Sequence, residues 1–424
     1  MSVSQTLPTS NLQRHIEWIR EQFPALLLEV GGRSATYFDG PGGTQVPRRV
    51  IDAIADYLTR SNCNVHGGFE TSRRTDFTIA SARSAMADML GCEAEEIVFG
   101  PNMTTLTFAI SRAIGRELGP GDEIVVTTLD HDANVAPWRA LAERGCVIRQ
   151  ATVNVADCTL DLDDLRSKIT PKTKLLAIGY ASNAVGTINP VSEIVRMAHQ
   201  AGAVVYVDAV HYAPHGVIDV KALDCDFLAC SVYKFYGPHA GVLYGKRAHF
   251  EHFSPYKVRP SSNHSPERWE TGTLNHEALA GVSAAIAYLA ELGGRIDISA
   301  QTRRDALIAA MTAIREHERC LAERMLRGLL QVPGLTVYGI QDFARFDHRT
   351  PTFAVRVNGH PPKELSEKLG ERGIFTWEGN YYAVNLTERL ELEDKGGMLR
   401  IGLAHYNTEQ EVDRFLSELN RIVE

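Results

Sequence analysis

The sequence predicts a doubly wound α/β fold with a mainly parallel sheet, followed by a smaller α+β domain. Short apolar runs rich in β-branched residues alternate with helical stretches from about residue 75 onward. Each run is apolar on both faces, as strands are when helices cover both sides of a sheet. After about residue 285 the alternation gives way to a long amphipathic helix and further strand-like runs.

The apolar runs predict five buried parallel strands joined by helical crossovers. In chain order they are EEIVFG, DEIVVTT, KLLAIGY, AVVYVDAV and DFLACSVYK. Two of the predicted helices close with a glycine, Gly91 and Gly202, a residue that ends many helices. In the C-terminal part, one long helix is predicted over 303–331, and strands follow at LTVYGI, TFAVRV and LRIGLA.

The 424 residues are enough for two or three domains, and no internal repeat or long linker divides them. We expect residues 1–30 to form a segment that packs on the small domain. A large domain is predicted over 31–285 and a small domain over 286–424.

Composition and charge exclude several classes of function. The net charge of −8 argues against a nucleic-acid surface, which needs clustered Lys and Arg. A secretory signal and a run of eighteen apolar residues are both absent, so we expect a cytoplasmic protein that contacts no membrane. The seven scattered cysteines contain no CxxC pair and predict neither disulfides nor a zinc site. A small-molecule ligand is therefore expected.

Ligands of a doubly wound sheet bind where the strands end, so polar residues directly after the apolar runs are candidate site residues. In FGPNMTTLTF, Asn102, Thr104 and Thr105 precede a helix whose free N–H groups would suit a phosphate, although an ordinary helix cap has the same pattern. His131 follows EIVVTT and could lie over a planar cofactor, or be a structural turn histidine.

Asp208 ends VVYVD and Lys234 follows DFLAC, in the last two of the five predicted strands. A carboxylate at a buried strand end needs a cation such as a protonated pyridine nitrogen, unless it caps a helix or forms an ion pair. A partly desolvated lysine has a lowered pKa and can form imines, although a lysine at a strand end is more often solvated. Lys234 comes 26 residues after Asp208. The phosphate-type segment, His131, Asp208 and Lys234, taken together in this order, indicate a cofactor site more specifically than any one of them does.

With these residues in view, the sequence resembles the class V aminotransferase group of fold-type-I pyridoxal phosphate enzymes, within it the cysteine desulfurase-like and selenocysteine lyase branch. The resemblance covers nearly the whole chain. Its motifs are YFDGPGGTQVP, DHDANVAPW, SNAVGTINP, YVDAVHYAPHGVIDVKALDCDF, SVYKFYGP, RWETGTLN and LRIGLAHYNTEQEVDRFL. It implies pyridoxal 5′-phosphate as cofactor, a small amino acid as substrate and no metal.

The resemblance also implies roles for single residues. Lys234 matches the lysine that forms the Schiff base with the cofactor. Asp208 matches the partner of the pyridinium nitrogen, and His131 matches the ring that stacks on the cofactor; these three are the expected catalytic residues. Asn183 is expected near the phenolic oxygen of the cofactor and near the substrate.

Further residues are expected at the cofactor phosphate and at the substrate. Met103, Thr104 and Ser231 match positions around the phosphate. Thr273 matches a threonine that reaches the phosphate of the neighbouring subunit, which implies a homodimer with shared active sites. Arg400 matches the arginine that binds the substrate carboxylate, a task suited to a bidentate guanidinium.

Several positions depart from the desulfurase pattern. His211 replaces the usual glutamine and Tyr233 the usual histidine, and we still expect both at the cofactor. Gly67 stands where an arginine is common. Tyr382 stands where the loop bearing the sulfur-accepting cysteine has that cysteine, and no cysteine follows Cys320. A thiolate attack from this loop is therefore not expected.

Without that thiol, we expect the substrate to form an external aldimine that loses its α-proton to Lys234. Elimination of a β-thiol would then make the enzyme a carbon–sulfur lyase for a cysteine-like substrate. Desulfurase or selenocysteine lyase activity, epimerisation, transamination and a degenerate scaffold are the alternatives. Tyr382 is expected at the substrate, and Tyr381, Trp377 and His66 are candidates for the same pocket, with simple packing as the alternative.

Overall fold

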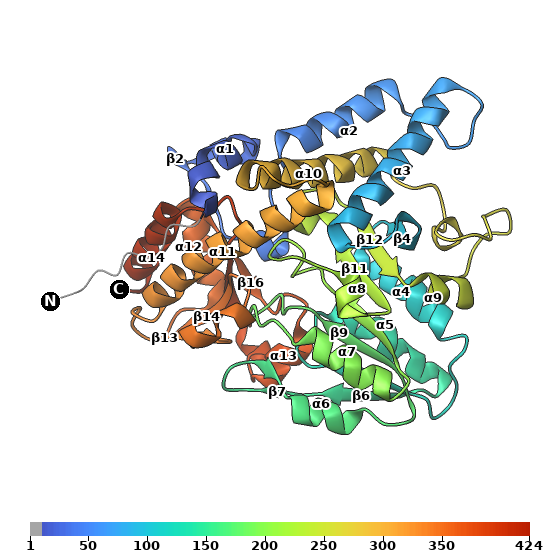
Figure 1. Ribbon diagram of the computed structural model, residues 1–424. Helices are drawn as coiled ribbons and strands as arrows, with labels where there is room; N and C mark the ends of the chain where they lie inside the picture. Colours follow the sequence, from blue (N-terminus) through green and yellow to red (C-terminus); the bar gives the residue numbers. More distant parts are fainter. Residues whose placement is uncertain (1–10) are drawn as a thin grey trace.

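The computed structural model describes residues 11–424, and its centre is a seven-stranded sheet with the order β4-β12-β11-β10-β9-β5-β6 (Figure 1). The strands are β4 Ile97–Gly100, β5 Glu123–Thr127, β6 Val147–Ala151, β9 Thr173–Gly179, β10 Val204–Asp208, β11 Phe227–Ser231 and β12 Gly241–Gly245. The pairs β6–β5–β9–β10–β11 are parallel, whereas β12 is antiparallel to both of its neighbours. The predicted mainly parallel sheet is confirmed.

The five predicted strands are β4, β5, β9, β10 and β11, and two strands of the sheet lie outside the prediction. In β6, at the edge of the sheet, the sequence VIRQA is only partly buried and lacks the continuous apolar pattern. In β12, the sequence GVLYG is bounded by two glycines, which weaken the strand signal.

Successive side chains of the central strands point to opposite faces of the sheet. In β10, Val205 and Val207 belong to one core cluster, and Tyr206 belongs to another. The first cluster contains residues of α3 Glu70–Leu90, α7 Val191–Gln200 and α10 His276–Ile296, and the second those of α4 Met103–Ile114, α5 Ala136–Arg139 and α9 Arg247–His252. Helices therefore cover both faces, as expected for a doubly wound sheet.

Both predicted glycine stops are present. Gly91 follows α3 with a left-handed φ of +76° and donates its N–H to the carbonyl of Ala87. Gly202 lies two residues beyond α7 with a φ of +77°. A side chain at either position would strain the backbone, so glycine favours the end of the helix there.

A second sheet forms the C-terminal part, with the antiparallel order β13-β14-β17-β16. Its strands are β13 Leu335–Tyr338, β14 Thr352–Val357, β16 Trp377–Gly379 and β17 Met398–Gly402. The helices α11 Arg303–Leu329, α12 Pro362–Glu371 and α14 Glu409–Val423 share a core with it. The long predicted helix and the three predicted strands are thus confirmed. The predicted boundary between residues 285 and 286 falls within α10, and the division into domains stays a prediction.

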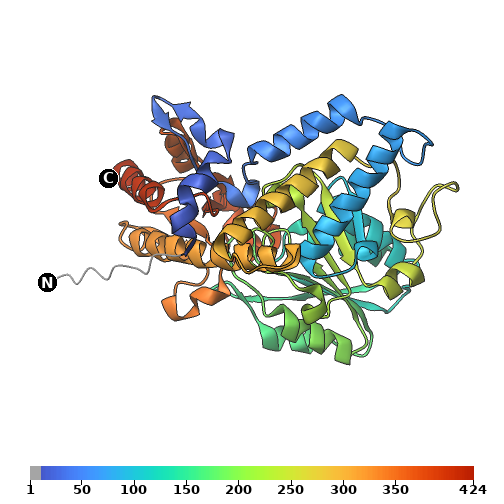
Figure 2. The same cartoon turned by 45° about the horizontal axis from the view of Figure 1, so that its top comes forward.

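The remaining α-helices and β-strands of residues 11–424 lie around these two sheets. They are α1 Ile16–Glu21, β1 Glu29–Val30, β2 Arg33–Ser34, β3 Thr36–Tyr37, α2 Arg48–Arg60, β7 Val153–Asn154, β8 Thr159–Leu160, α6 Leu162–Lys168, α8 Val220–Leu223, β15 Ile374–Phe375 and α13 Val384–Arg389. Figure 2 shows α2, α3 and α10 lying side by side.

By length and composition alone, α10 could cross a membrane, with a mean hydropathy of 1.2. Half of that stretch is buried, and the helix packs against α2, α3 and α11. This is the pattern of a core helix.

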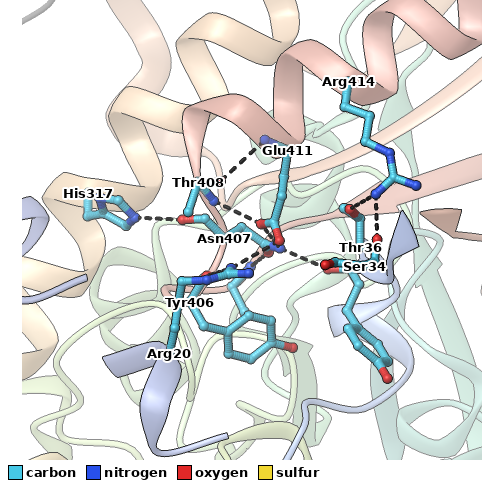
Figure 3. Close-up of polar contacts among 11 residues, drawn as sticks. Arg20, Ser34, Thr36, His317, Tyr406, Asn407, Thr408, Glu411 and Arg414 are labelled. Carbon is cyan, nitrogen blue, oxygen red and sulfur yellow. Dashed lines mark hydrogen bonds and ion pairs between the residues drawn. The ribbon is translucent and has the colours of Figure 1, made fainter. Parts of the chain in front are cut away.

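The predicted N-terminal segment contacts α14 through Arg20, while residues 1–10 of that segment lie outside the described residues (Figure 3). The guanidinium of Arg20 donates to the carbonyl of Tyr406 at 2.7 Å and to the carboxylate of Glu411 at 3.0 Å. Glu411 also accepts from the side chain of Asn407 at 3.1 Å and from the N–H of Thr408 at 3.0 Å, closing a capping box at the start of α14. One buried carboxylate thus joins the N-terminal segment to the C-terminal helix.

Replacing Glu411 with alanine is expected to lower the free energy of unfolding by about 2–4 kcal/mol, because Arg20 and the buried Asn407 would each lose one of their acceptors. Urea denaturation measures the change. Glu409→Ala is the matched control, since Glu409 lies in the same turn with a half-exposed ion pair to Arg324 and should cost less than about 1 kcal/mol. Equal losses in the two variants would contradict this role of Glu411.

Candidate active site

A cavity of about 590 Å³ lies at the carboxyl ends of β5, β9, β10 and β11, with residues of β16 and β17 on its far side. Of the twelve residues expected at the cofactor or the substrate, all except Thr273 line this cavity, whereas the pocket candidate His66 does not. The residues are Met103, Thr104, His131, Asn183, Asp208, His211, Ser231, Tyr233, Lys234, Tyr382 and Arg400. Side chains spread over about 300 residues of chain therefore meet at the predicted edge of the sheet, while their individual roles stay predictions.

Lys234 lies in a single helical turn directly after β11, and its ammonium group is held by backbone carbonyls. Nζ donates to the carbonyl oxygens of Pro41 at 2.6 Å and Gly42 at 3.0 Å and lies 4.8 Å from the centre of the Tyr233 ring. Burial, with a smaller contribution from the nearby Arg400, lowers the pKa of Lys234 to about 7. A large fraction of the amine is then neutral at neutral pH and can act as nucleophile or base.

Asp208 ends β10 as a buried carboxylate without an ion pair. One carboxylate oxygen accepts the N–H of Val210 at 2.9 Å, and no cationic group of residues 11–424 lies within 4.0 Å of it. Burial raises the pKa of Asp208 to about 6, against the opposing effect of Lys234. Such a carboxylate is suited to a cationic ligand group placed beside it.

Asp130 is a second buried carboxylate in the cavity, and the sequence analysis missed it. It accepts the N–H of Gly179 at 2.8 Å and the side-chain N–H of Asn134 at 3.1 Å. Burial raises the pKa of Asp130 to about 7, and the charge of Asp208 acts in the same direction. The signal that identified His131, a polar residue directly after a strand, applies equally to Asp130.

The His131 ring is neutral and has a defined orientation. Its Nδ1 accepts the N–H of Ala133 at 3.0 Å, which leaves Nε2 as the protonated nitrogen. Burial lowers the pKa of His131 to about 4. The ring stacks with that of Tyr382, with 5.4 Å between the centroids and 28° between the planes. A neutral, fixed ring is suited to stacking against a planar ligand.

The amino end of α4 opens into the cavity. The N–H of Met103 donates to the hydroxyl oxygen of Ser231 at 3.1 Å, and Thr104 lines the cavity. Asn102 caps the helix by accepting the N–H of Thr105 at 2.9 Å. The helix cap and the anion-binding geometry are therefore both present, and the positive end of the helix dipole favours a phosphate at this place.

Arg400 and Asn183 lie together on the other side of the cavity. The guanidinium of Arg400 donates to the Asn183 carbonyl at 2.9 Å and lies 4.3 Å from the centre of the Tyr381 ring. Burial lowers the pKa of Arg400 to about 10, so the group keeps its charge at neutral pH. The amide of Asn183 donates to the Tyr381 carbonyl at 2.9 Å, while its buried Oδ1 has no partner within the described part of the chain. The free guanidinium N–H groups can bind a carboxylate.

Asp39 is another residue that the sequence analysis did not identify. Burial raises the pKa of its carboxyl to about 6, although Arg400 and Lys234 oppose the shift. Its Oδ1 is buried and has no hydrogen-bond partner among residues 11–424. The sequence YFDGPGG gave no periodic signal that would have predicted a buried carboxylate at this position.

The two ring residues that depart from the desulfurase pattern both lie in the cavity wall. Nε2 of His211 is 3.0 Å from the hydroxyl of Thr350 and 3.1 Å from that of Thr352, the first residue of β14. Burial lowers the pKa of His211, so its ring is neutral. The ring of Tyr233 stacks with that of His239, with 4.8 Å between the centroids. Both rings therefore keep polar groups at the cavity.

Thr273 and His66 lie away from this cavity. They line a separate open cavity of about 960 Å³ together with Arg83 and Glu270. Within a single chain, neither residue lines the cavity that contains Lys234, so the expectation that His66 lines the same pocket is wrong for one subunit. A role of Thr273 on a neighbouring subunit stays a prediction.

The Aminotransferase class-V family matches residues 36–415. The chain belongs to this family. Cysteine desulfurases from Enterobacter sp. (strain 638) and Serratia proteamaculans (strain 568) are each 34% identical over 424 residues, covering 96% of this chain and 98% of theirs. The apo cysteine desulfurase from Thermococcus onnurineus NA1 has a TM-score of 0.85 at 28% identity, covering 96% of this chain and 98% of that one.

A second solved structure is the cysteine desulfurase CsdA from Escherichia coli in its S-sulfonic acid form, with a TM-score of 0.82 at 29% identity and coverage of 96% and 98%. This class V enzyme is therefore cysteine desulfurase-like in sequence and fold. Enzymes of the family depend on pyridoxal phosphate, as the resemblance implied.

In this class V enzyme, Arg400→Lys is expected to raise KM for an amino-acid substrate by about 10- to 100-fold, because an ammonium cannot reproduce two parallel hydrogen bonds to a carboxylate. Steady-state kinetics measures the effect, and the absorbance of the bound cofactor should be unchanged. A KM equal to that of the native enzyme would show that the substrate carboxylate binds elsewhere.

Proposed function

We propose that this protein is a pyridoxal phosphate-dependent carbon–sulfur lyase that acts on a cysteine-like amino acid. The observation that carries the proposal is the absence of a thiol from the cavity: within the described chain, which includes all seven cysteines, none lines it. Burial also raises the pKa of the Cys158 thiol to about 11 and that of the Cys225 thiol to about 12. Such thiols are poor nucleophiles at neutral pH.

The cavity residues fit pyridoxal phosphate in their chemistry. Asp208, a buried carboxylate that forms no ion pair within residues 11–424, would bind the protonated ring nitrogen, and the neutral His131 would stack on the ring. The buried Oδ1 of Asn183, which has no partner in the same residues, would have a polar group to bind. Thr104 and the Ser231 hydroxyl at the start of α4 would bind the phosphate. When bound, the cofactor supplies an electron sink for the negative charge that develops at the substrate α-carbon.

The protein's own groups would then bind the substrate and move its proton. The guanidinium of Arg400 would bind the substrate carboxylate and fix the direction of the α-hydrogen. Nζ of Lys234, with a pKa of about 7, can take the α-proton. Loss of the β-substituent with its bonding electrons then converts substrate and water into a free thiol, pyruvate and ammonium. No step requires a second nucleophile from the protein.

Cysteine desulfurase or selenocysteine lyase activity is the second candidate, and the named relatives favour it because they are cysteine desulfurases. Epimerisation or transamination would use the same α-proton transfer at Lys234. A degenerate scaffold, which would keep the fold without catalytic activity, is disfavoured. It could lose Lys234, Asp208, His131 or Arg400 while keeping its core, yet all four line one cavity.

The product distinguishes the candidates. Purified protein loaded with cofactor is incubated with L-cysteine and with S-substituted cysteines, and pyruvate and alanine are quantified. The lyase proposal predicts pyruvate, together with one equivalent of thiol. Alanine accompanied by sulfur release would overturn it in favour of the desulfurase, and Lys234→Ala is the control in which neither product should form.

We also propose a homodimer with shared active sites, as the family resemblance implies. Thr273 and His66 line the same open cavity outside the active site of their own chain, which supports a contribution to a neighbouring one. Sedimentation of the native protein and of Thr273→Ala, each with its cofactor content, would test this arrangement. A monomer with full cofactor content would overturn it.

A further inference from the structure

Two large aromatic side chains remain exposed where they line the active-site cavity. Trp377 is 51% exposed and Tyr382 is 71% exposed, although both line the cavity that contains Lys234. They come from one short segment, 377–382, which begins with β16. Exposed indole and phenol rings in a ligand cavity offer a large apolar contact surface that the fold itself does not bury.

Trp377 lies beside the reacting end of the cavity. In the β16–β17 ladder it pairs directly with Arg400. Its indole Nε1 lies so close to Gly42 that a Cβ added at Gly42 would be only 2.5 Å away. The carbonyl of Gly42 in turn accepts from Nζ of Lys234 at 3.0 Å. The indole is therefore close to both the base and the carboxylate-binding arginine.

Tyr382 is held in place by a strained backbone. Tyr381 and Tyr382 have left-handed φ angles of +56° and +60°, which are unfavourable for residues with bulky side chains. Their carbonyls accept from the Asn183 amide at 2.9 Å and from the N–H of Asp132 at 2.7 Å, and Asn380 accepts the N–H of Tyr382 at 3.0 Å. These hydrogen bonds maintain the strained backbone, which places the Tyr382 ring over His131. Strain of this kind within an active site points to a function for that ring.

We propose that Trp377 and Tyr382 bind a planar apolar group carried on the sulfur of the substrate, so that the substrates are cysteine S-conjugates of the aryl thioether class. This inference rests on the proposed lyase function and names its substrate class. L-Cysteine itself carries no group that would contact two aromatic rings. An arylthiolate is also a good leaving group, because its thiol has a low pKa.

The reaction balances without a further reactant. The α-proton moves to Nζ of Lys234, the Cβ–S bond breaks, and its electron pair leaves with the sulfur as arylthiolate. Water then hydrolyses the three-carbon remainder to pyruvate and ammonium, so that one S-aryl-cysteine and one water give one aryl thiol, one pyruvate and one ammonium.

The test compares kcat/KM for pyruvate formation from S-phenyl-L-cysteine and S-methyl-L-cysteine in the native enzyme and in ring-deleted variants. Dividing the two values in each variant, and then comparing variants, removes the intrinsic difference between the leaving groups. Tyr382→Ala and Trp377→Ala are each expected to lower this ratio by about tenfold, mainly through KM for the S-phenyl substrate. Tyr382→Phe keeps the ring and should keep the ratio, and Tyr256→Ala removes an exposed tyrosine outside the cavity as a control.

Each outcome decides one of the two proposals. A ratio that stays at the native value in both alanine variants, with pyruvate still formed, would overturn the aromatic site and leave the lyase function intact. A ratio that falls equally in Tyr382→Phe would also overturn the role of the ring. Pyruvate from none of the substrates would overturn the lyase function and this inference with it.

Discussion

Lys234→Ala is expected to lower kcat/KM for pyruvate formation by about 10³-fold or more, because the variant would lose the amine that we propose as both the cofactor-binding group and the base for the α-proton. The yellow absorbance of the bound cofactor should be lost as well. Because Nζ, within residues 11–424, donates only to the carbonyls of Pro41 and Gly42, the fold should remain, as circular dichroism can verify. Partial recovery of activity with a small primary amine in the buffer would show that the missing group is an amine. Retention of activity within about tenfold of the native value would contradict the role of Lys234.

The pH dependence of the activity follows from the pKa of Lys234. The pKa of Lys234 is lowered to about 7, so the neutral amine that can take a proton becomes the major form as the pH rises through that value. Activity limited by this base is expected to rise with pH through about 7 and then to level off. A profile that falls over the same range would assign the limiting step to another group.

Asp208→Asn is expected to lower kcat by about 10²- to 10³-fold, because a neutral amide cannot hold a positive charge on the cofactor ring. The amide can still accept the N–H of Val210, which the carboxylate accepts at 2.9 Å. Cofactor titration followed by steady-state kinetics separates weaker binding from slower turnover. Native kcat in the variant would contradict the proposed role of Asp208.

The same substitution, which is expected to lower kcat, should raise the stability of the cofactor-free protein. The pKa of Asp208 is raised from 3.8 to about 6, so the folded protein binds this proton more tightly than the unfolded chain does. Stability is then lost as the pH rises from about 4 through 6. Cofactor-free Asp208→Asn, which has no proton to lose, is expected to be about 1–3 kcal/mol more stable than the native apoprotein at pH 8. Urea denaturation at pH 8 and below pH 4 should show that the gain disappears in acid.

Periodicity in the sequence was sufficient to predict most of the fold. Strands buried on both faces, such as β10, are continuous apolar runs, and Gly91 and Gly202 mark the ends of helices. The edge strand β6 and the glycine-bounded β12 lack that signal, because their positions are set by pairing with neighbours and not by their own composition.

The candidate site was predictable where chemistry and strand order coincide. Asp208 ends a strand, and Lys234 and His131 each follow one, so their meeting in one cavity follows from topology. Asp130 carries the same signal as His131, because it too follows β5, whereas Asp39 could not be identified in this way. Only burial makes the Asp39 carboxyl group unusual, and burial at loops depends on contacts between distant segments. The left-handed conformation of two successive tyrosines is likewise a tertiary effect, maintained by Asn183 and Asp132.

The central claim is that no cysteine of this enzyme takes part in cleaving the carbon–sulfur bond, and intact-protein mass spectrometry tests it most directly. The cofactor-loaded protein is allowed to turn over L-cysteine and an S-substituted cysteine, and its mass is then measured without reductant. An unmodified chain together with accumulated pyruvate is the expected result. A persulfide on any of the seven cysteines, formed in step with alanine, would contradict it.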